Sequence, residues 1–163
     1  MIKYLPLVIF SHQNQLFALE ATFVRGQGRV EFLAAGALLL PFAQLLTPKT
    51  LVPFCPVGSP SLVSSSSLAC PLHWLGLAGG QLSTASGQQN WLLGIEGEAE
   101  LVELPVEQIQ PLPPLLLARR TFPALQAAAW YQQRLVSLID ARVLLTLAPP
   151  LLTSVTPDAS LVE

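Results

Sequence analysis

Short apolar runs separated by turn-forming residues dominate the pattern of this chain. The first two runs, residues 7–10 and 16–19, have a polar connection of hairpin length between them and therefore predict a β-hairpin. A glycine pair within residues 25–29 indicates a turn after this hairpin. Later runs of strand length, bounded by glycine, proline or polar pairs, are residues 30–33, 37–40, 72–77, 91–95, 101–104, 124–131 and 135–139. Many short strands of this kind are typical of an all-β sandwich or barrel.

Prolines and a capping residue mark where the strand pattern stops. Residues 47–71 are rich in proline and serine and predict a loop region, with residues 62–63 as a strand candidate inside it. Residues 111–114 contain prolines that cannot donate ladder hydrogen bonds, so they predict an edge or a crossover between strands. Residues 141–145 predict one short helix, because Asp140 can cap its N-terminus.

The composition indicates one packed domain. Of the 163 residues, 52% are hydrophobic and 11% are charged, which excludes a chain that is disordered throughout. This length is enough for one domain with a real core and too short for two independent ones. We therefore expect a single domain over residues 1–147 and a C-terminal tail over residues 148–163.

Charge and the length of the apolar runs argue against two kinds of partner. The net charge is −2 and the Lys and Arg residues are scattered, so no basic stripe is available to bind nucleic acid. The run closest to a membrane span, residues 32–46, is interrupted by Gly36 and Pro41. The apolar stretch at residues 4–10 is short and lacks a cleavage pattern. We expect a cytoplasmic protein without direct membrane insertion.

The sequence contains none of the common catalytic or cofactor-binding motifs, so we expect no enzymatic activity, no cofactor and no metal. His12 and His73 could act as general bases near neutral pH, but neither adjoins a nucleophile. Cys55 and Cys70 are expected to be reduced thiols. An enzyme is the alternative if Cys70, His73 and a cluster of glutamates converge in one deep pocket.

The acidic and aromatic residues carry the remaining signals. Half of the ten acidic residues lie in one short stretch, at Glu96, Glu98, Glu100, Glu103 and Glu107. If this stretch is a strand, the first three share one face, which is either solvated or covered by a basic partner. The three tryptophans are interpreted first as core or half-buried strand residues and second as interface anchors, and they are Trp74, Trp91 and Trp130.

The second half of the chain carries a family resemblance. A hydrophobic strand ends at Ile95-Glu96, and a second strand leads into Glu107-Gln108-Ile109-Gln110-Pro111-Leu112-Pro113. Residues 127–140 cover most of the last two predicted strands and end in an acidic residue before the predicted helix. Together with the opening hairpin, these segments resemble the CheW-like coupling proteins of bacterial chemosensory systems, over roughly residues 7–147, and the resemblance implies that residues 127–140 are the final hairpin of that family.

This resemblance implies a fold and a role. The fold is two small five-stranded β-barrels with a short C-terminal helix and no active site. The role is a non-catalytic adaptor that joins the regulatory domain of a CheA-type histidine kinase to chemoreceptor signalling tips. The alternative is a structural CheW-like protein that self-associates into a homo-oligomer without receptor coupling.

The chain departs from the family pattern in its first half. The Arg-Gly pair associated with receptor coupling is replaced by Ala35-Gly36 or, in the other register, Gly36-Ala37. The segment from residue 18 to 41 is shorter than the family norm, so the first barrel could lack a strand or be open. If docking occurs through the first barrel, the candidate contact residues and nearby charges are Arg25, Arg29, Gly36, Pro41, Phe42 and Leu45.

Overall fold

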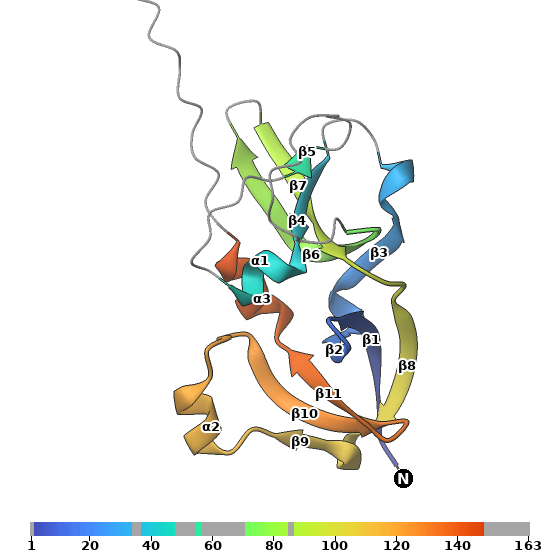
Figure 1. Cartoon of the computed structure of the whole chain (residues 1–163), viewed down its shortest axis with the longest axis vertical. Helices are drawn as coiled ribbons and strands as arrows, with labels where there is room; N and C mark the ends of the chain where they lie inside the picture. Colours follow the sequence, from blue (N-terminus) through green and yellow to red (C-terminus); the bar gives the residue numbers. More distant parts are fainter. Residues whose placement is uncertain (1, 34–36, 48–54, 57–70, 85–86, 149–163) are drawn as a thin grey trace, which may run out of the picture.

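Two β-sheets make up most of the computed structural model, which describes residues 2–33, 37–47, 55–56, 71–84 and 87–148 (Figure 1). One sheet has six strands in the order β8-β1-β2-β11-β10-β9, and the other has five in the order β3-β6-β7-β4-β5. The strands of the first sheet are β1 (Tyr4–His12), β2 (Gln15–Glu20), β8 (Glu100–Pro105), β9 (Ile109–Pro111), β10 (Leu125–Tyr131) and β11 (Arg134–Ile139). Those of the second are β3 (Val24–Arg29), β4 (Leu38–Pro41), β5 (Cys55–Pro56), β6 (His73–Thr84) and β7 (Gly87–Ile95). The all-β prediction is confirmed.

Short helices connect several strands. They are α1 (Phe42–Leu46), α2 (Pro114–Arg119), α3 (Ala141–Leu147) and the 3₁₀ turns η1 (Ala21–Phe23), η2 (Val30–Phe32) and η3 (Val106–Gln108). The predicted helix is confirmed as α3, where an Asp140 carboxylate oxygen accepts a hydrogen bond from the Arg142 N–H at 2.8 Å. The pattern does not predict α1 and α2, because so short an apolar run cannot be assigned to helix or strand from periodicity. No helix of the described residues is long and apolar enough to cross a membrane.

Two tight hairpins shape the six-stranded sheet. The turn between β1 and β2 consists of Gln13 and Asn14, with φ of 47° and 65°. The turn between β10 and β11 consists of Gln132 and Gln133, with φ of 48° and 61°. Left-handed backbone at both turn residues matches the twist of the flanking strands. Both predicted hairpins are therefore confirmed.

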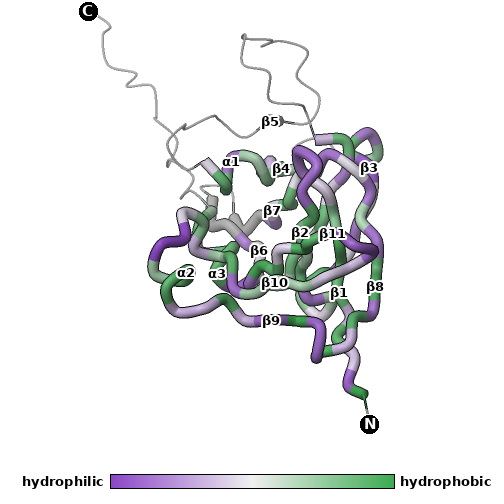
Figure 2. The backbone as a smooth tube through the Cα atoms, turned by 60° about the horizontal axis from the view of Figure 1, so that its bottom comes forward, coloured by the Kyte–Doolittle hydropathy of each residue, from purple (hydrophilic) through white to green (hydrophobic). Residues whose placement is uncertain are grey.

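Strand β1 contributes to two separate cores, because its side chains are buried on both faces. Leu7 and Ile9 belong to a cluster inside the six-stranded sheet, whereas Val8 and Phe10 belong to a larger cluster that also holds residues of the five-stranded sheet. Successive side chains of a strand point to opposite faces, so the run at residues 7–10 has to be apolar throughout. Figure 2 shows the hydrophobic residues of β1 and β2 alongside those of β11.

Parallel pairings join parts of the chain that are distant in sequence. Strand β11 runs parallel to β2, with Val136 opposite Leu16, and β4 runs parallel to β7, with Leu39 opposite Leu92. Helix α3 follows β11 and returns to the five-stranded sheet, where Leu144 is fully buried in the larger cluster. The C-terminal hairpin and helix therefore hold the two sheets together.

The third strand differs from its prediction. The pattern predicts a turn at residues 25–29 and a strand at 30–33, but the strand is β3 and the following residues are η2. Gly28 lies opposite Trp74 on β6, and a Cβ at Gly28 would approach the Trp74 ring to 3.0 Å. The glycines of this segment thus allow an aromatic ring to lie against the strand, and they do not form a turn.

Several predicted features lie outside the described residues. They include the strand candidate at residues 62–63, most of the predicted loop region 47–71, and all of the tail 148–163 except residue 148. Within the loop region, the two-residue strand β5 pairs antiparallel with β4. The two described sheets have six and five strands, whereas the resemblance implies five strands in each barrel.

Candidate protein-binding surface

The structure divides the predicted docking residues between surface and core. Arg25 and Arg29 lie on β3, and both side chains are exposed. Pro41 is the last residue of β4 and is partly buried. Gly36 lies outside the described residues. The five-stranded sheet therefore exposes the two arginines. The remaining two candidates belong to the core.

Those two candidates, Phe42 and Leu45 of α1, are corrected to core residues. Only 2% and 5% of their surfaces are exposed. The Phe42 ring packs edge-on, at centroid distances of 4.8 to 6.0 Å, against the rings of Phe10, His12, Phe17 and Phe122. These partners come from the six-stranded sheet and from the segment before β10, whereas α1 follows directly on β4. Phe42 therefore packs the two sheets together and is not available to a partner.

A buried histidine makes a second link between the sheets. His12 Nδ1 lies 2.8 Å from Glu96 Oε1, and the Gln13 N–H donates to the other carboxylate oxygen at 3.3 Å. Glu96 directly follows β7, so its carboxylate holds the end of the β1–β2 hairpin against the five-stranded sheet. The arrangement satisfies polar groups at the junction of the sheets, which is a structural function.

The glutamate cluster does not lie on one strand, which corrects the predicted alternation. Strand β7 ends at Ile95 and β8 begins at Glu100, so residues 96–99 form the connection between them. Glu98 is exposed on this connection, and its Oε1 lies 3.8 Å from His73 Nε2. The chain has to reverse direction here, and that tertiary requirement overrides the alternation of the side chains.

A shallow cavity lies beside this connection. Its volume is about 260 Å³, and its lining includes Arg29, His73, Trp74 and Glu98. Both His73 ring nitrogens are buried without a hydrogen-bond partner among the described residues. No described lining residue carries a hydroxyl, thiol or amine, and Cys70 lies outside the described residues. In the described part of the chain, no group of three or more His, Cys, Asp and Glu side chains could hold a metal ion.

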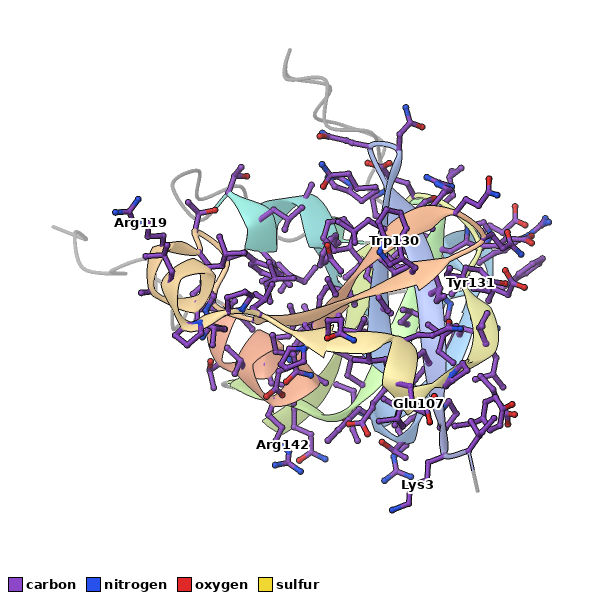
Figure 3. All side chains as sticks on the ribbon, turned by 90° about the horizontal axis from the view of Figure 1, so that it is seen from below. Lys3, Glu107, Arg119, Trp130, Tyr131 and Arg142 are labelled. Carbon is purple, nitrogen blue, oxygen red and sulfur yellow. The ribbon has the colours of Figure 1, made fainter. Side chains whose placement is uncertain are left out.

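The hairpin of β10 and β11 presents a large apolar pair to solvent. Trp130 and Leu135 are directly opposite in the strand register, and 61% and 54% of their surfaces are exposed. Their chain neighbours Ala129 and Val136 point to the other face and are buried. Figure 3 shows Trp130 on β10. The pattern assigns Trp130 first to the core, so its exposure corrects that interpretation and favours the second one, an interface anchor.

This apolar pair lies on a well-supported part of the sheet. The Arg134 guanidinium donates a hydrogen bond to the Asn14 carbonyl at 2.7 Å, which ties the tips of the two hairpins together. The β10–β11 ladder runs from Tyr131–Arg134 at the tip to Leu125–Ile139 at the base. Because the strands on either side are held by these bonds, Trp130 can be presented to a partner at a low cost in ordering entropy.

Helix α2 is a second exposed apolar element. None of its six residues is buried, and the exposed fractions of Leu115, Leu116 and Leu117 are 64%, 53% and 38%. The helix begins at Pro114, a favoured first position, and ends at Arg119. A proline-initiated run of three leucines is a sequence signal for such a helix, but whether those leucines are covered depends on the tertiary structure.

Comparisons with known proteins identify the fold. No family model matches this sequence, and no curated protein matches it. The crystal structure of the scaffolding protein TtCheW from Thermoanaerobacter tengcongensis superposes with a TM-score of 0.51, at 11% sequence identity, over 84% of this chain and 89% of that chain. The chain has a CheW-like fold. The fold that the sequence resemblance implies is thereby confirmed. Within this fold, Trp130 lies on β10 of the six-stranded sheet, and α2 lies in the connection between β9 and β10.

Proposed function

We propose that this protein is a non-catalytic scaffold of a chemosensory pathway that binds the regulatory domain of a CheA-type histidine kinase. The structural neighbour is described as a scaffolding protein, and the described residues include two groups of exposed large apolar side chains, on the β10–β11 hairpin and on α2. The observation that carries the proposal is the exposed cross-strand pair Trp130 and Leu135. We assign this pair as the centre of the kinase contact.

Exposed tryptophan on a rigid hairpin has the properties of a binding hot spot. Tryptophan is enriched among the residues that dominate interface energies, and it buries a large area on association. Leu135 beside it extends the apolar centre, and Gln132, Gln133 and Arg134 provide a polar rim. An apolar centre with a polar rim is the usual anatomy of a specific protein interface.

The arginines of β3 provide a second contact in this proposal. Arg25 takes part in no ion pair among the described residues. Within the described part of the chain, the ion pairs of Arg29 are long and exposed, at 3.5 Å to Glu31 and 3.9 Å to Glu98. Such pairs contribute little to stability, so both guanidiniums are free to bind carboxylates of another protein. We assign chemoreceptor signalling tips to this strand, with Pro41 of β4 as a further candidate on the same sheet.

Calorimetry with the kinase regulatory domain from the same source tests the proposal. We expect binding at micromolar affinity or tighter, and we expect Trp130→Ala to weaken it by about 30-fold or more, which corresponds to about 2 kcal/mol. Tyr4→Ala is the matched control, because it also removes an aromatic side chain that is 54% exposed, from strand β1, which β2 and β11 separate from β10.

Each outcome has a distinct meaning. Unchanged affinity of Trp130→Ala would reject the hairpin as the contact while keeping the kinase as the partner. Absence of binding by the unaltered protein, with the kinase domain shown to be folded, would reject the kinase as partner. The CheW-like likeness would then be one of fold alone.

A further inference from the structure

Two exposed apolar surfaces, one on α2 and one on strands β1 and β8, have charged side chains of opposite sign beside them. The first, the leucine face, consists of Leu115, Leu116 and Leu117 of α2 with Arg119 at the helix end. Residues 111–126, which contain the helix, include two arginines and no acidic residue. Arg119 takes part in no ion pair among the described residues. The leucine face is therefore an apolar surface with an unneutralised positive charge beside it.

The second surface, the acidic face, lies on the outward side of β1 and β8. Tyr4 and Leu101 are 54% and 66% exposed, and the exposed Glu103 lies between them on the same face of the paired strands. Glu100 and Glu107 are exposed at the two ends of this region, and Lys3 lies at the Glu107 end (Figure 3). None of the three glutamates takes part in an ion pair among the described residues.

The register of the strands accounts for this exposure. Leu101 pairs with Val8, Glu103 with Pro6, and Tyr4 with Pro105, so alternate residues of both strands share the outward face. The intervening Val102 and Leu104 point inward and pack in the smaller core. Leu101 therefore has no core to join, although its neighbours along the strand do.

We propose that a second copy of this chain places its leucine face on the acidic face. Each surface alone exposes apolar area next to unpaired charge, and together they bury the leucines against Tyr4 and Leu101 while Arg119 approaches Glu103. Two leucine faces would instead bring like charges together, which is unfavourable at an interface. Complementarity therefore favours contact between unlike faces of two copies.

The positions of the two faces determine the form of the assembly. Figures 1 and 2 show α2 on one side of the molecule and β8 on the other. A contact between two different faces leaves one free face on each end copy, so it extends into rings or filaments instead of closing as a two-fold dimer. This self-association is separate from the kinase contact, because it does not use Trp130 or Leu135.

Two variants test the contact in the full-length protein. We expect the mass measured by sedimentation and light scattering to rise past that of a dimer over a roughly hundredfold range of concentration. Leu116→Glu and Leu101→Arg should each weaken self-association at least tenfold, since each places a charge at the centre of one apolar face. Gln27→Glu, an exposed change on β3, is the control and should assemble like the unaltered protein. Circular dichroism confirms that each variant is folded.

Mixing the two variants gives the sharpest result. Leu116→Glu keeps an intact acidic face and Leu101→Arg keeps an intact leucine face, so an equimolar mixture should form a heterodimer and stop there. An isologous contact predicts no recovery on mixing, and that result would overturn the proposal. A protein that is monomeric at every concentration would also overturn the proposal. If that monomer sediments with phosphatidylglycerol vesicles, α2 is assigned to a lipid surface instead.

Kinase binding separates this inference from the proposed function. Leu116→Glu and Leu101→Arg should retain the affinity of the unaltered protein for the kinase regulatory domain, because Trp130 lies outside both faces. Loss of self-association with retained kinase binding supports both proposals. A protein that binds the kinase but never self-associates would overturn the present inference alone.

Discussion

At the scale of single residues, the hairpin turns show a mismatch between sequence and backbone. Gln13, Asn14, Gln132 and Gln133 all have positive φ, which only glycine adopts without a steric cost and which asparagine tolerates. The turn between β10 and β11 is made of two glutamines, so it holds more strain than the turn that contains Asn14. This hairpin carries the exposed Trp130, and its geometry is imposed by the strand ladder.

Replacing Gln133 by glycine should relieve part of this strain. We expect Gln133→Gly to raise the free energy of unfolding by about 0.5–1 kcal/mol, since the left-handed penalty exceeds the entropy cost of glycine in the unfolded chain. Urea denaturation measures the change. Gln27→Gly, in strand β3, is the control and should lower stability by a similar amount. A decrease for Gln133→Gly would show that the turn is not strained.

At the scale of elements, β3 shows why a glycine pattern can be misinterpreted. Glycine permits a turn, and it equally permits close approach of another group, and the sequence does not distinguish the two. A Cβ at Gly26 would lie 3.6 Å from the Trp74 ring, whereas one at Gly28 would lie 3.0 Å from it. The two positions therefore differ in the space above them, although they occur in the same local sequence.

This difference gives a matched pair of substitutions. Gly28→Ala should lower the free energy of unfolding by about 1–2 kcal/mol, because the Trp74 ring has to shift to accept the methyl group. Gly26→Ala should be neutral or stabilise by up to about 1 kcal/mol, because the methyl group meets ordinary contact distance and the unfolded chain loses freedom. Thermal denaturation of both variants checks this. Equal effects would contradict a specific contact with Trp74.

At the scale of the whole molecule, one cluster unites the two sheets. It contains Phe10 and Phe17 from the six-stranded sheet, Leu75 and Leu93 from the five-stranded sheet, and Phe42 between them. Because both sheets bury side chains in the same cluster, unfolding of one sheet would expose the buried apolar side chains of the other to solvent. We therefore treat the described residues as one cooperative unit.

Phe42 is the residue at which this cooperativity is tested. Phe42→Ala should lower the free energy of unfolding by about 3–5 kcal/mol, since it leaves a cavity at the junction of the sheets. Phe32→Ala removes the same side chain at a position that is 79% exposed, and it should change stability by less than about 0.5 kcal/mol. Urea denaturation compares them. Similar effects of both changes would place Phe42 outside the core.

The binding surfaces could be predicted from the sequence only in part. Trp130 is recognisable as an aromatic residue in a strand, and its neighbours alternate as a strand should, but alternation does not state which face is covered. Phe42 and Leu45 lie in an equally apolar segment and prove to be core residues. Exposure depends on which elements pack together, and that information is distributed over contacts that are distant in sequence, such as the pairing of β2 with β11.

The all-β class, both glutamine-containing hairpins, the capped helix α3 and the likeness to CheW-like proteins could all be predicted before the structure, because they follow from local periodicity, turn chemistry and short motifs. Three other features emerge only from the folded structure: β3 lies under Trp74, residues 96–99 are a connection, and α2 exposes its leucines. These features depend on long-range packing, which decides between local conformations that the sequence alone leaves close in energy.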